Sequence, residues 1–511
     1  MDRLETTSIA DLQAAMATGE LTARALLELY LQRIATWDPL VHSVIELNPD
    51  AGDIAAALDR ERRAGRVRGP MHGIPVLIKD NIDTADRMMT TAGSLALVGP
   101  APARDATVAA RLRAAGAVIL GKANLSEWAN FRSSHSASGW SARGGQCRNP
   151  HVLDRSPSGS SAGSGAAAAA AFAAITLGTE TDGSIIGPSA ASGVVGIKPT
   201  VGLTSRAGVI PVAHSQDTVG LHARSVADAA TALGALVGLD PRDGATAASD
   251  GRFHTDYRPF LDREGLRGAR IGIARKPFWG YSAKADRVGE EAIAALREAG
   301  AVIVDPADLP TADQAWALSQ GRWSEGPGDT SELDVLYYEF KHDLNAYLAT
   351  RTGVPVRTLA DVIRFNEEHA AEELRHFGQE HFLTAEARGP LTDPAYLQAL
   401  AKSRWLGGTG GIDAALAANH LDALFCPSFA PAVPIDQVSG EVGHGGSTSP
   451  SARAGYPIVT VPAGFDHDLP ISVSFIGTAW SEPALIRLAY AFEQATRAWR
   501  APRFLRSAIA D

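Results

Sequence analysis

Two Ser/Gly clusters are the part of the sequence whose residue types and spacing are most suited to chemistry. SPSGSSAGSG (156–165) opens an Ala-rich segment, and GTETDGS (178–184) follows that segment. A glycine-rich helix start can bind phosphate through its backbone N–H groups, but the lysine of a P-loop and a GxGxxG pattern are both missing. Nucleophilic catalysis is the alternative. A serine hydroxyl needs a nearby base, and its tetrahedral intermediate needs N–H donors; TDGS (181–184) contains both a serine and such donors.

Serine and lysine residues in such motifs can also have purely structural roles. Ser160 is a plausible helix cap, and Lys79, at the end of GIPVLIKDN (73–81), is a plausible surface lysine. A histidine-based triad is conceivable because four histidines lie near the motifs, namely His72, His135, His214 and His222. However, the GxSxG elbow of such hydrolases is missing. HExxH and other zinc patterns are missing too, so we expect no metal and no cofactor.

The first half of the chain alternates helix and strand. We expect helices at 9–36, with Thr22 as a plausible N-cap, and at 50–64. A buried strand is expected at 73–81, and 105–125 is predicted as a helix, stopped at Gly116, and then a strand. The Ala-rich run 165–178 is shorter than the roughly 20 residues of a membrane span, and we interpret it as a buried helix followed by a strand. Long loops are predicted at 130–160 and at about 178–215.

The second half begins with helices, at 284–300 and over much of 330–420. Strands then follow at 422–428, 457–464 and 470–477, and a helix at 483–499 closes the pattern. Alternation at both ends predicts an α/β fold with one sheet built from both ends of the chain and helices on each face. We expect residues 1–511 to form one large domain, with a mostly helical, more variable region at about 240–420.

Composition narrows the class of protein. The chain has 511 residues, 45% of them hydrophobic, with a formal net charge of −10 and a pI near 5.8. That charge disfavours nucleic acid and anionic membranes as partners. The N-terminus does not resemble a signal peptide. Cys147 and Cys426 lack metal-ligand spacing and suit a reducing compartment. We therefore expect a cytoplasmic protein, as a monomer or homodimer.

Taken together, the motifs resemble those of the amidase signature family. SGSSAGSG, GTETDGSI and the upstream GIPVLIKDN occur in the family's order, and Ser160 and Ser184 are 24 residues apart, as the family's two serines are. Further similar segments occupy 193–211, 215–220 and 223–230. The resemblance implies a central mixed, twisted sheet flanked on both faces by helices.

The resemblance also implies catalytic roles for matching residues. Ser184 matches the nucleophile, Ser160 the bridging serine that follows a cis peptide bond, and Lys79 the terminal base. The backbone N–H groups that match the oxyanion hole are those of Thr181, Asp182, Gly183 and Ser184. The reaction implied is amide hydrolysis through a covalent acyl-enzyme.

This chemistry makes one electrostatic demand on Lys79. The lysine must be neutral to take a proton, although a model lysine titrates near pH ~10.4. Operation near pH ~7.5 requires the pKa to be lowered by about 3 units, roughly 4 kcal/mol. Burial, together with the positive end of the helix that begins near Ser161, would lower it. We therefore predict activity that rises into mildly alkaline pH.

The motif around Ser184 departs from the commonest family pattern, GTDTGGSIR. Glu180, Asp182 and Ile186 occupy the changed places, and the Asp182 carboxylate is expected to repel anionic substrates. This variant, with NLSEWANFR (124–132), GGQCRNP (144–150) and FIGTAWSE (475–482), resembles bacterial peptide amidases, which remove the C-terminal amide of peptides. Pocket walls are expected from 127–140, including Phe131 and Ser134, and from 320–420.

Other substrates and one other function stay open at this point. Aryl acylamides, aliphatic amides, esters or carbamates all suit the same scaffold. The amidase component of a tRNA-dependent amidotransferase is an alternative, which would imply protein partners and tRNA. The segments similar to peptide amidases favour a free-standing enzyme that acts on a small-molecule or peptide amide.

Overall fold

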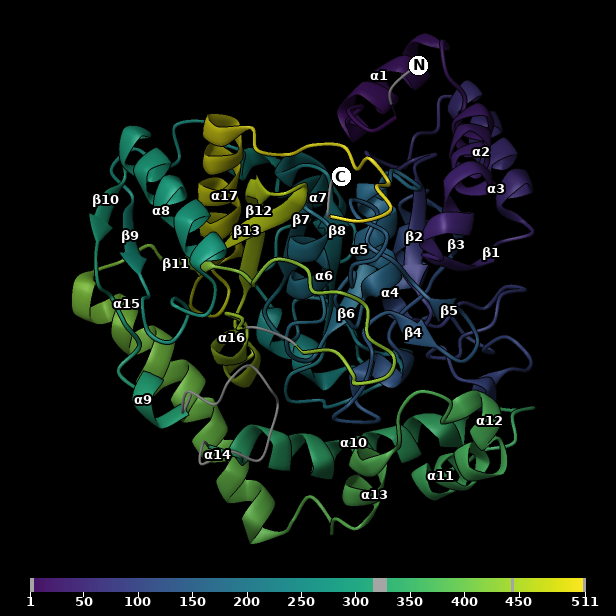
Figure 1. Cartoon of the computed structure of the whole chain (residues 1–511). Coiled ribbons are helices and arrows are strands. Elements are labelled where there is room, and N and C mark those ends of the chain that lie inside the picture. Colours follow the sequence, from purple (N-terminus) through teal and green to yellow (C-terminus); the bar gives the residue numbers. More distant parts are fainter. Residues whose placement is uncertain (1–3, 316–328, 443–444, 509–511) are drawn as a thin grey trace.

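A mixed sheet of eleven strands organises the chain in the computed structural model, which describes residues 4–315, 329–442 and 445–508 (Figure 1). In order across the sheet the strands are β1 (Val44–Leu47), β3 (Val118–Ala123), β2 (Pro75–Lys79), β6 (Ile175–Glu180), β8 (Thr218–Ala223), β7 (Val195–Lys198), β12 (Ile458–Asp466), β13 (Leu469–Ile476), β11 (Ala423–Pro427), β9 (Arg270–Ile273) and β10 (Val302–Val304). Strands from both ends of the chain therefore share one sheet, as predicted.

The helices cover both faces of this sheet (Figure 1). In the first half they are α1 (Ile9–Thr18), α2 (Ala23–Val41), α3 (Ala51–Arg63), α4 (Thr107–Ala114), α5 (Ala162–Ala169), α6 (Ile186–Ala191) and α7 (Val226–Leu233). In the second half they are α8 (Ala283–Glu298), α9 (Ala312–Ala315), α10 (Ser331–Thr350), α11 (Leu359–Glu368), α12 (Ala370–Glu373), α13 (Glu380–Glu386), α14 (Pro394–Gly407), α15 (Asp413–Asn419), α16 (Ser449–Ala454) and α17 (Glu482–Thr496). Helices α10 to α14 form the green arc along the lower edge of Figure 1.

Strands β2 and β6 bring Lys79 close to the second predicted motif. The two strands run parallel, with Ile78 opposite Leu177. Parallel neighbours end at the same edge of a sheet, so Lys79 at the end of β2 reaches the Gly178–Glu180 end of β6. Helix α5 joins the Ser160 cluster to β6 by passing over the sheet, and its side chains pack in the main hydrophobic core.

Two predicted elements differ from the structure. The helix expected at 9–36 is interrupted: Gly19 takes a φ of +78° and ends α1, after which the Thr22 hydroxyl accepts the N–H of Ala25 and caps α2. The loop expected at 178–215 contains α6 and the buried strand β7. Both elements are short and rich in Gly, Ser or Pro, so their composition resembles that of a loop.

The region at 240–420 contains helices α8 to α15 and also contributes two strands to the sheet. β9 and β10 pair in parallel and extend the sheet beyond β11. They have only four and three residues, too few to show a period in the sequence. Residues 130–160 are the predicted long loop, with a single hairpin of β4 (Trp140–Ser141) and β5 (Gly145–Gln146).

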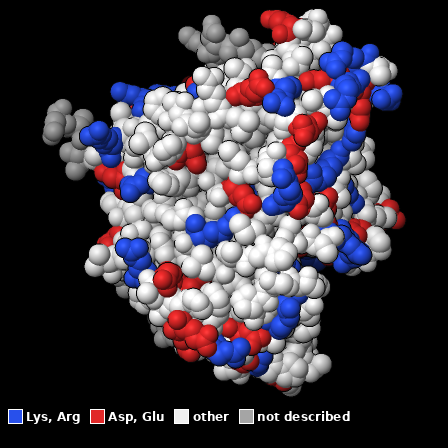
Figure 2. All heavy atoms as spheres, turned by 90° about the vertical axis from the view of Figure 1, so that its right-hand side faces the viewer, with Lys and Arg blue, Asp and Glu red and all other residues white. Residues whose placement is uncertain are grey.

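The face of the molecule near the N-terminal helices carries charges of both signs. Figure 2 shows basic and acidic side chains interspersed there. Arg68 pairs with Glu61 at 2.5 Å and Arg87 with Asp50 at 2.6 Å. Helices within residues 4–315, 329–442 and 445–508 all lack the combination of length and apolar composition that crossing a membrane requires.

Candidate active site

Lys79 is fully buried at the end of β2 and lies against Ser160. Its Nζ is 2.8 Å from Ser160 Oγ, 3.0 Å from Thr179 Oγ1 and 3.3 Å from the carbonyl oxygen of Thr179. The carbonyl can only accept a hydrogen bond. A neutral lysine can therefore donate its two N–H groups to Thr179 and keep its lone pair for the Ser160 hydroxyl.

The surroundings of Lys79 favour this neutral form. Burial lowers the pKa of Lys79 to about 7, against the opposing influence of the nearby Asp217 and Glu180 carboxylates. A lysine that titrates there is a competent base near neutral pH. The sequence prediction of a pKa lowered by about 3 units agrees with this value.

Ser160 follows a cis peptide bond with Gly159, as the resemblance implied. Its carbonyl oxygen accepts the N–H of Ser126 at 2.9 Å, which fixes the backbone. The N-cap position of α5 is Ser161, so the Ser160 hydroxyl is not used as a helix cap. Instead it faces Lys79. The N–H of Ser161 donates to the carbonyl oxygen of Ser184 at 3.1 Å, which places the two serine clusters side by side.

Four backbone N–H groups lie in the turn at 181–184. Among the described residues, none of the N–H groups of Thr181, Asp182, Gly183 and Ser184 donates a hydrogen bond. The next two, of Ile185 and Ile186, donate to Glu180 Oε2 at 2.6 and 2.9 Å. Gly183 has a φ of +78°, which disfavours a side chain there. An oxyanion requires N–H donors that are not already engaged by other acceptors.

Several site residues were not singled out from the sequence, although they lie in its motifs. Asn81 donates to Thr179 Oγ1 at 2.9 Å, and Asp217 accepts the Thr181 hydroxyl at 2.6 Å. Burial raises the pKa of Asp217 to about 6. These residues, with Ser160, line a cavity of about 10 Å³, which is about the space of one water molecule.

Asp182 faces the segments that cover the turn from the other side. Its Oδ2 accepts the Ser449 hydroxyl of α16 at 2.6 Å. Glu332, in the first turn of α10, accepts Gln216 at 3.0 Å and the Nε of Arg453 at 3.0 Å. Burial and the nearby Asp182 raise the pKa of Glu332 to about 8, against the effect of Arg453. The turn is therefore acidic on this side.

Neither of the two predicted wall residues lines the cavity beside Ser160. Phe131 packs in a cluster with Tyr337, Phe340 and His381, with its ring stacked on His381 at 5.4 Å. Ser134 is exposed and donates to Glu380 at 2.8 Å. A role in substrate binding stays a prediction for both. Residues 320–328, also expected to line the pocket, lie outside the described residues.

The histidines weighed as bases have other partners. Within the described parts of the chain, no histidine nitrogen forms a hydrogen bond with Ser160 or Ser184. His222 is buried, with its Nδ1 2.8 Å from Ser189 Oγ, and burial lowers its pKa to about 3. His72 Nε2 lies 3.0 Å from the carbonyl oxygen of Leu58, and His135 lies beside Glu380.

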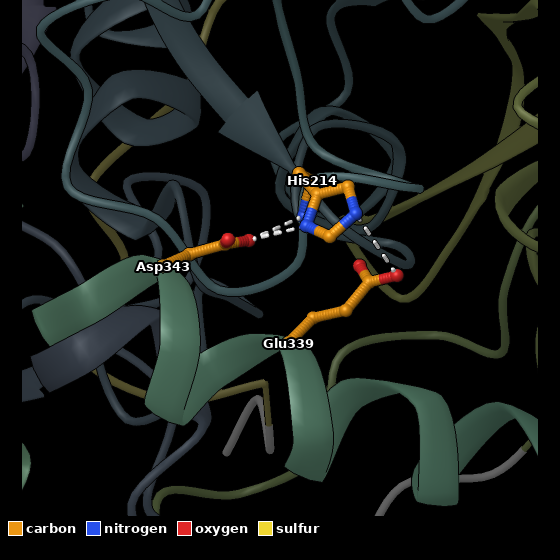
Figure 3. A group of neighbouring side chains, drawn as sticks. All are labelled: His214, Glu339 and Asp343. Carbon is orange, nitrogen blue, oxygen red and sulfur yellow. Dashed lines mark hydrogen bonds and ion pairs between the residues drawn. The ribbon is translucent and has the colours of Figure 1, made fainter. Parts of the chain in front are cut away.

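One group in the described residues, His214 with Glu339 and Asp343, brings its ligand atoms within 4.8 Å of one another. Figure 3 shows the imidazole between two carboxylates of α10: Nδ1 is 2.8 Å from Asp343, and Nε2 is 3.5 Å from Glu339. Carboxylates at opposite ring nitrogens suit an imidazolium better than a metal ligand. Although burial lowers the pKa of His214, both carboxylates raise it overall. The contacts of His214 with Glu339 and Asp343 tie the loop before Asp217 to α10.

Comparison with known proteins shows which family the chain belongs to. The amidase family model matches residues 25–486. The chain therefore belongs to the amidase signature family. It is an amide hydrolase that acts on carbon–nitrogen bonds, in the amidase signature fold.

Individual relatives cover nearly the whole chain. The native peptide amidase from Stenotrophomonas maltophilia is 53% identical, with a TM-score of 0.90 over 98% of this chain and 99% of that one. A protein of Arabidopsis thaliana named as a probable amidase is 44% identical over 98% of this chain and 92% of its own. A component of the glutamyl-tRNA(Gln) amidotransferase of Chloroflexus aurantiacus is 35% identical over 98% of this chain and 99% of its own.

Proposed function

We propose that this amidase removes the C-terminal amide of peptides with a Ser184–Ser160–Lys79 triad. The observation that carries the proposal is the contact of Lys79 Nζ with Ser160 Oγ at 2.8 Å, formed by a buried lysine whose pKa is about 7. The unpaired N–H groups of residues 181–184 support the assignment of Ser184 as the nucleophile beside them.

The first half-reaction forms the acyl-enzyme. Ser184 Oγ attacks the carboxamide carbon, and its proton passes to Ser160, whose own proton passes to neutral Lys79. The N–H groups of Thr181 to Ser184 bind the oxyanion that develops. As the C–N bond breaks, the proton returns from Lys79 through Ser160 to the leaving nitrogen, and ammonia departs.

The second half-reaction repeats the sequence with water. A water molecule attacks the ester carbon and gives its proton through the same relay. Collapse of the second tetrahedral intermediate breaks the bond to Ser184 Oγ, which regains a proton, and a carboxylic acid leaves. Lys79 ends each half-reaction neutral, so the cycle closes without an outside acid or base.

Substrate choice is supported by similarity and by the acidic side of the turn. The sequence identity is 53% with the peptide amidase and 35% with the amidotransferase component. A carboxylate at Asp182, next to the proposed oxyanion donors, suits a neutral carboxamide better than an anionic substrate. We infer that peptide amides are preferred over free peptide acids and anionic amides.

The test is ammonia release from peptide C-terminal amides, aliphatic and aryl carboxamides, and anilides, by wild type and Ser184→Ala. We expect release from peptide amides, abolished by the substitution. Ser160→Ala and Lys79→Ala should lower kcat by at least about 100-fold. Ser164→Ala is a matched control: the hydroxyl of this buried serine of the same cluster donates to the carbonyl oxygen of Leu177, and the activity of the variant should stay near wild type.

Other outcomes separate the alternatives. Turnover of anilides or esters alone would leave the triad in place and reject the peptide amide substrate. Ammonia release that requires both tRNA and a co-purifying partner protein would favour an amidotransferase. Turnover that survives Ser184→Ala would mean that the nucleophile lies elsewhere.

A further inference from the structure

The ring of Phe429 lies across the turn that carries Ser184. Phe429 follows β11 and forms a β-bridge with Gly446. A Cβ atom built on Gly183 would lie 3.2 Å from Thr448 Oγ1 and 3.4 Å from Phe429 Cζ, and one built on Gly187 would lie 2.7 Å from Ser158 Oγ and 3.6 Å from Phe429 Cζ. These two glycines flank Ser184 in the sequence. Because neither has a side chain, the end of the aromatic ring lies close to the backbone beside Ser184.

The groups around the turn differ in polarity. Asp182 is held by the Ser449 hydroxyl at 2.6 Å. The ring of Phe429 packs against an apolar cluster that contains Ile185 and Ile186. An apolar group placed beside the Asp182 carboxylate would desolvate it at a cost in free energy. The ring is therefore the favourable surface for an apolar side chain of the substrate.

Phe429 is also partly accessible, as a substrate contact must be. The residue is half-buried, whereas Ile185 and Ile186 of the same cluster are fully buried. Its position is held by the hydrogen bond from the N–H of Ser447 to the carbonyl oxygen of Ser428, 3.1 Å long, which ties the segment after β11 to the segment before α16. The ring is thus fixed on the turn while part of it stays open.

We propose that Phe429 is a specificity-determining residue, whose ring forms the wall that receives an apolar side chain on the residue bearing the carboxamide. This inference rests on the proposed function, since it assumes that the acyl group is carried by Ser184. It names a substrate class: amides of apolar and aromatic amino acids, acylated at their nitrogen, in preference to glycinamides and to amides of acidic residues.

The experiment measures kcat/KM for ammonia release from N-acetyl-phenylalaninamide and N-acetyl-glycinamide. Phe429→Ala should lower the ratio of the two values by about 10-fold, the upper end of what an aromatic contact contributes. The value for N-acetyl-glycinamide alone should change by less than about 2-fold, because a glycine residue cannot use the wall. Phe429→Leu keeps an apolar side chain of similar size, so the ratio should fall less.

Controls distinguish this idea from a folding defect and from failure of the proposed function. Phe465→Leu changes a phenylalanine near the end of β12 that packs on Arg500 and His151, and its ratio should equal that of wild type. If kcat/KM for both substrates falls by the same factor in Phe429→Ala and Phe429→Leu, Phe429 has a structural role only. An unchanged ratio in an active Phe429→Ala enzyme would overturn the proposal. Release of ammonia from neither amide by wild type would instead reject the proposed function.

Discussion

Replacing Lys79 by methionine should stabilise the protein, and by an amount that depends on pH. Methionine has a similar length and no charge, and it suits the buried position. In the unfolded chain the lysine titrates near pH ~10.4, whereas in the fold its pKa is about 7. Folding at neutral pH must therefore either bury an ammonium or release its proton, and both cost free energy.

The size of the effect follows from these two pKa values. A basic group whose pKa is lowered in the fold imposes a cost below its unfolded pKa, which grows as the pH falls and levels off below the folded pKa. The cost is about 4 kcal/mol at pH 7 and about 2 kcal/mol at pH 9. The variant loses hydrogen bonds to Ser160 and Thr179 worth about 1 kcal/mol each at either pH. The difference in free energy of unfolding between the variant and wild type should therefore shrink by about 2 kcal/mol between pH 7 and pH 9.

Thermal unfolding of both proteins at the two pH values measures this difference. For a chain of 511 residues the unfolding entropy is on the order of 1 kcal/mol per degree, so the difference in Tm should narrow by about 2 °C. Lys402→Met is the control, because that side chain is 59% exposed and its substitution should show little dependence on pH. A difference between Lys79→Met and wild type that is the same at pH 7 and pH 9 would refute the lowered pKa.

Three further predictions concern the groups around the site. The kcat/KM of wild type should rise about 10-fold from pH 6 to pH 8 with a midpoint near 7, as Lys79 loses its proton; a flat profile would exclude Lys79 as the base. Asp217→Asn removes a negative charge that raises the pKa of Lys79, so the midpoint of the same profile should move to lower pH, and an unmoved midpoint would limit Asp217 to a structural role. His214→Gln should cost about 1 kcal/mol of stability at pH 6 and less at pH 9, because a group whose pKa is raised in the fold stabilises below its unfolded pKa and loses that effect as the pH rises through the folded pKa. Urea unfolding at the two pH values tests this, and equal losses would contradict an imidazolium at His214.

Much of the first half of the fold could be predicted because its helices and strands have a clear periodicity of apolar residues or clear boundary residues. The strand GIPVLIKDN and the helix and strand around Gly116 appear where expected. Strand β7 could not be predicted in this way, since it has four residues, one of them the glycine at 196. Its identity as a central strand comes from pairing with β8 and β12, the second of which lies far away in the sequence.

The same distinction applies to the site. Lys79, Ser160 and Ser184 could be proposed from the sequence because they lie in ordered motifs with fixed spacing. Asn81 and Thr179 lie within those motifs, but only the structure shows that they share contacts with Lys79. Phe429 and Ser449 come from a distant part of the chain, outside the motifs, and no local pattern connects them with Ser184. Contacts of this type depend on topology, which single-sequence patterns do not contain.

The pairing of β7 with β12 has a consequence for how the chain is made. Ile458 of β12 pairs with Lys198 of β7, and about 260 residues separate them in the sequence. While the ribosome synthesises the intervening residues, β7 is the last strand of an incomplete sheet, with apolar side chains and unpaired backbone groups along one side. Such an edge is a template for pairing with other chains. Messages truncated before residue 458 should therefore yield aggregates, and the last part of the chain protects the nascent protein as well as completing its sheet.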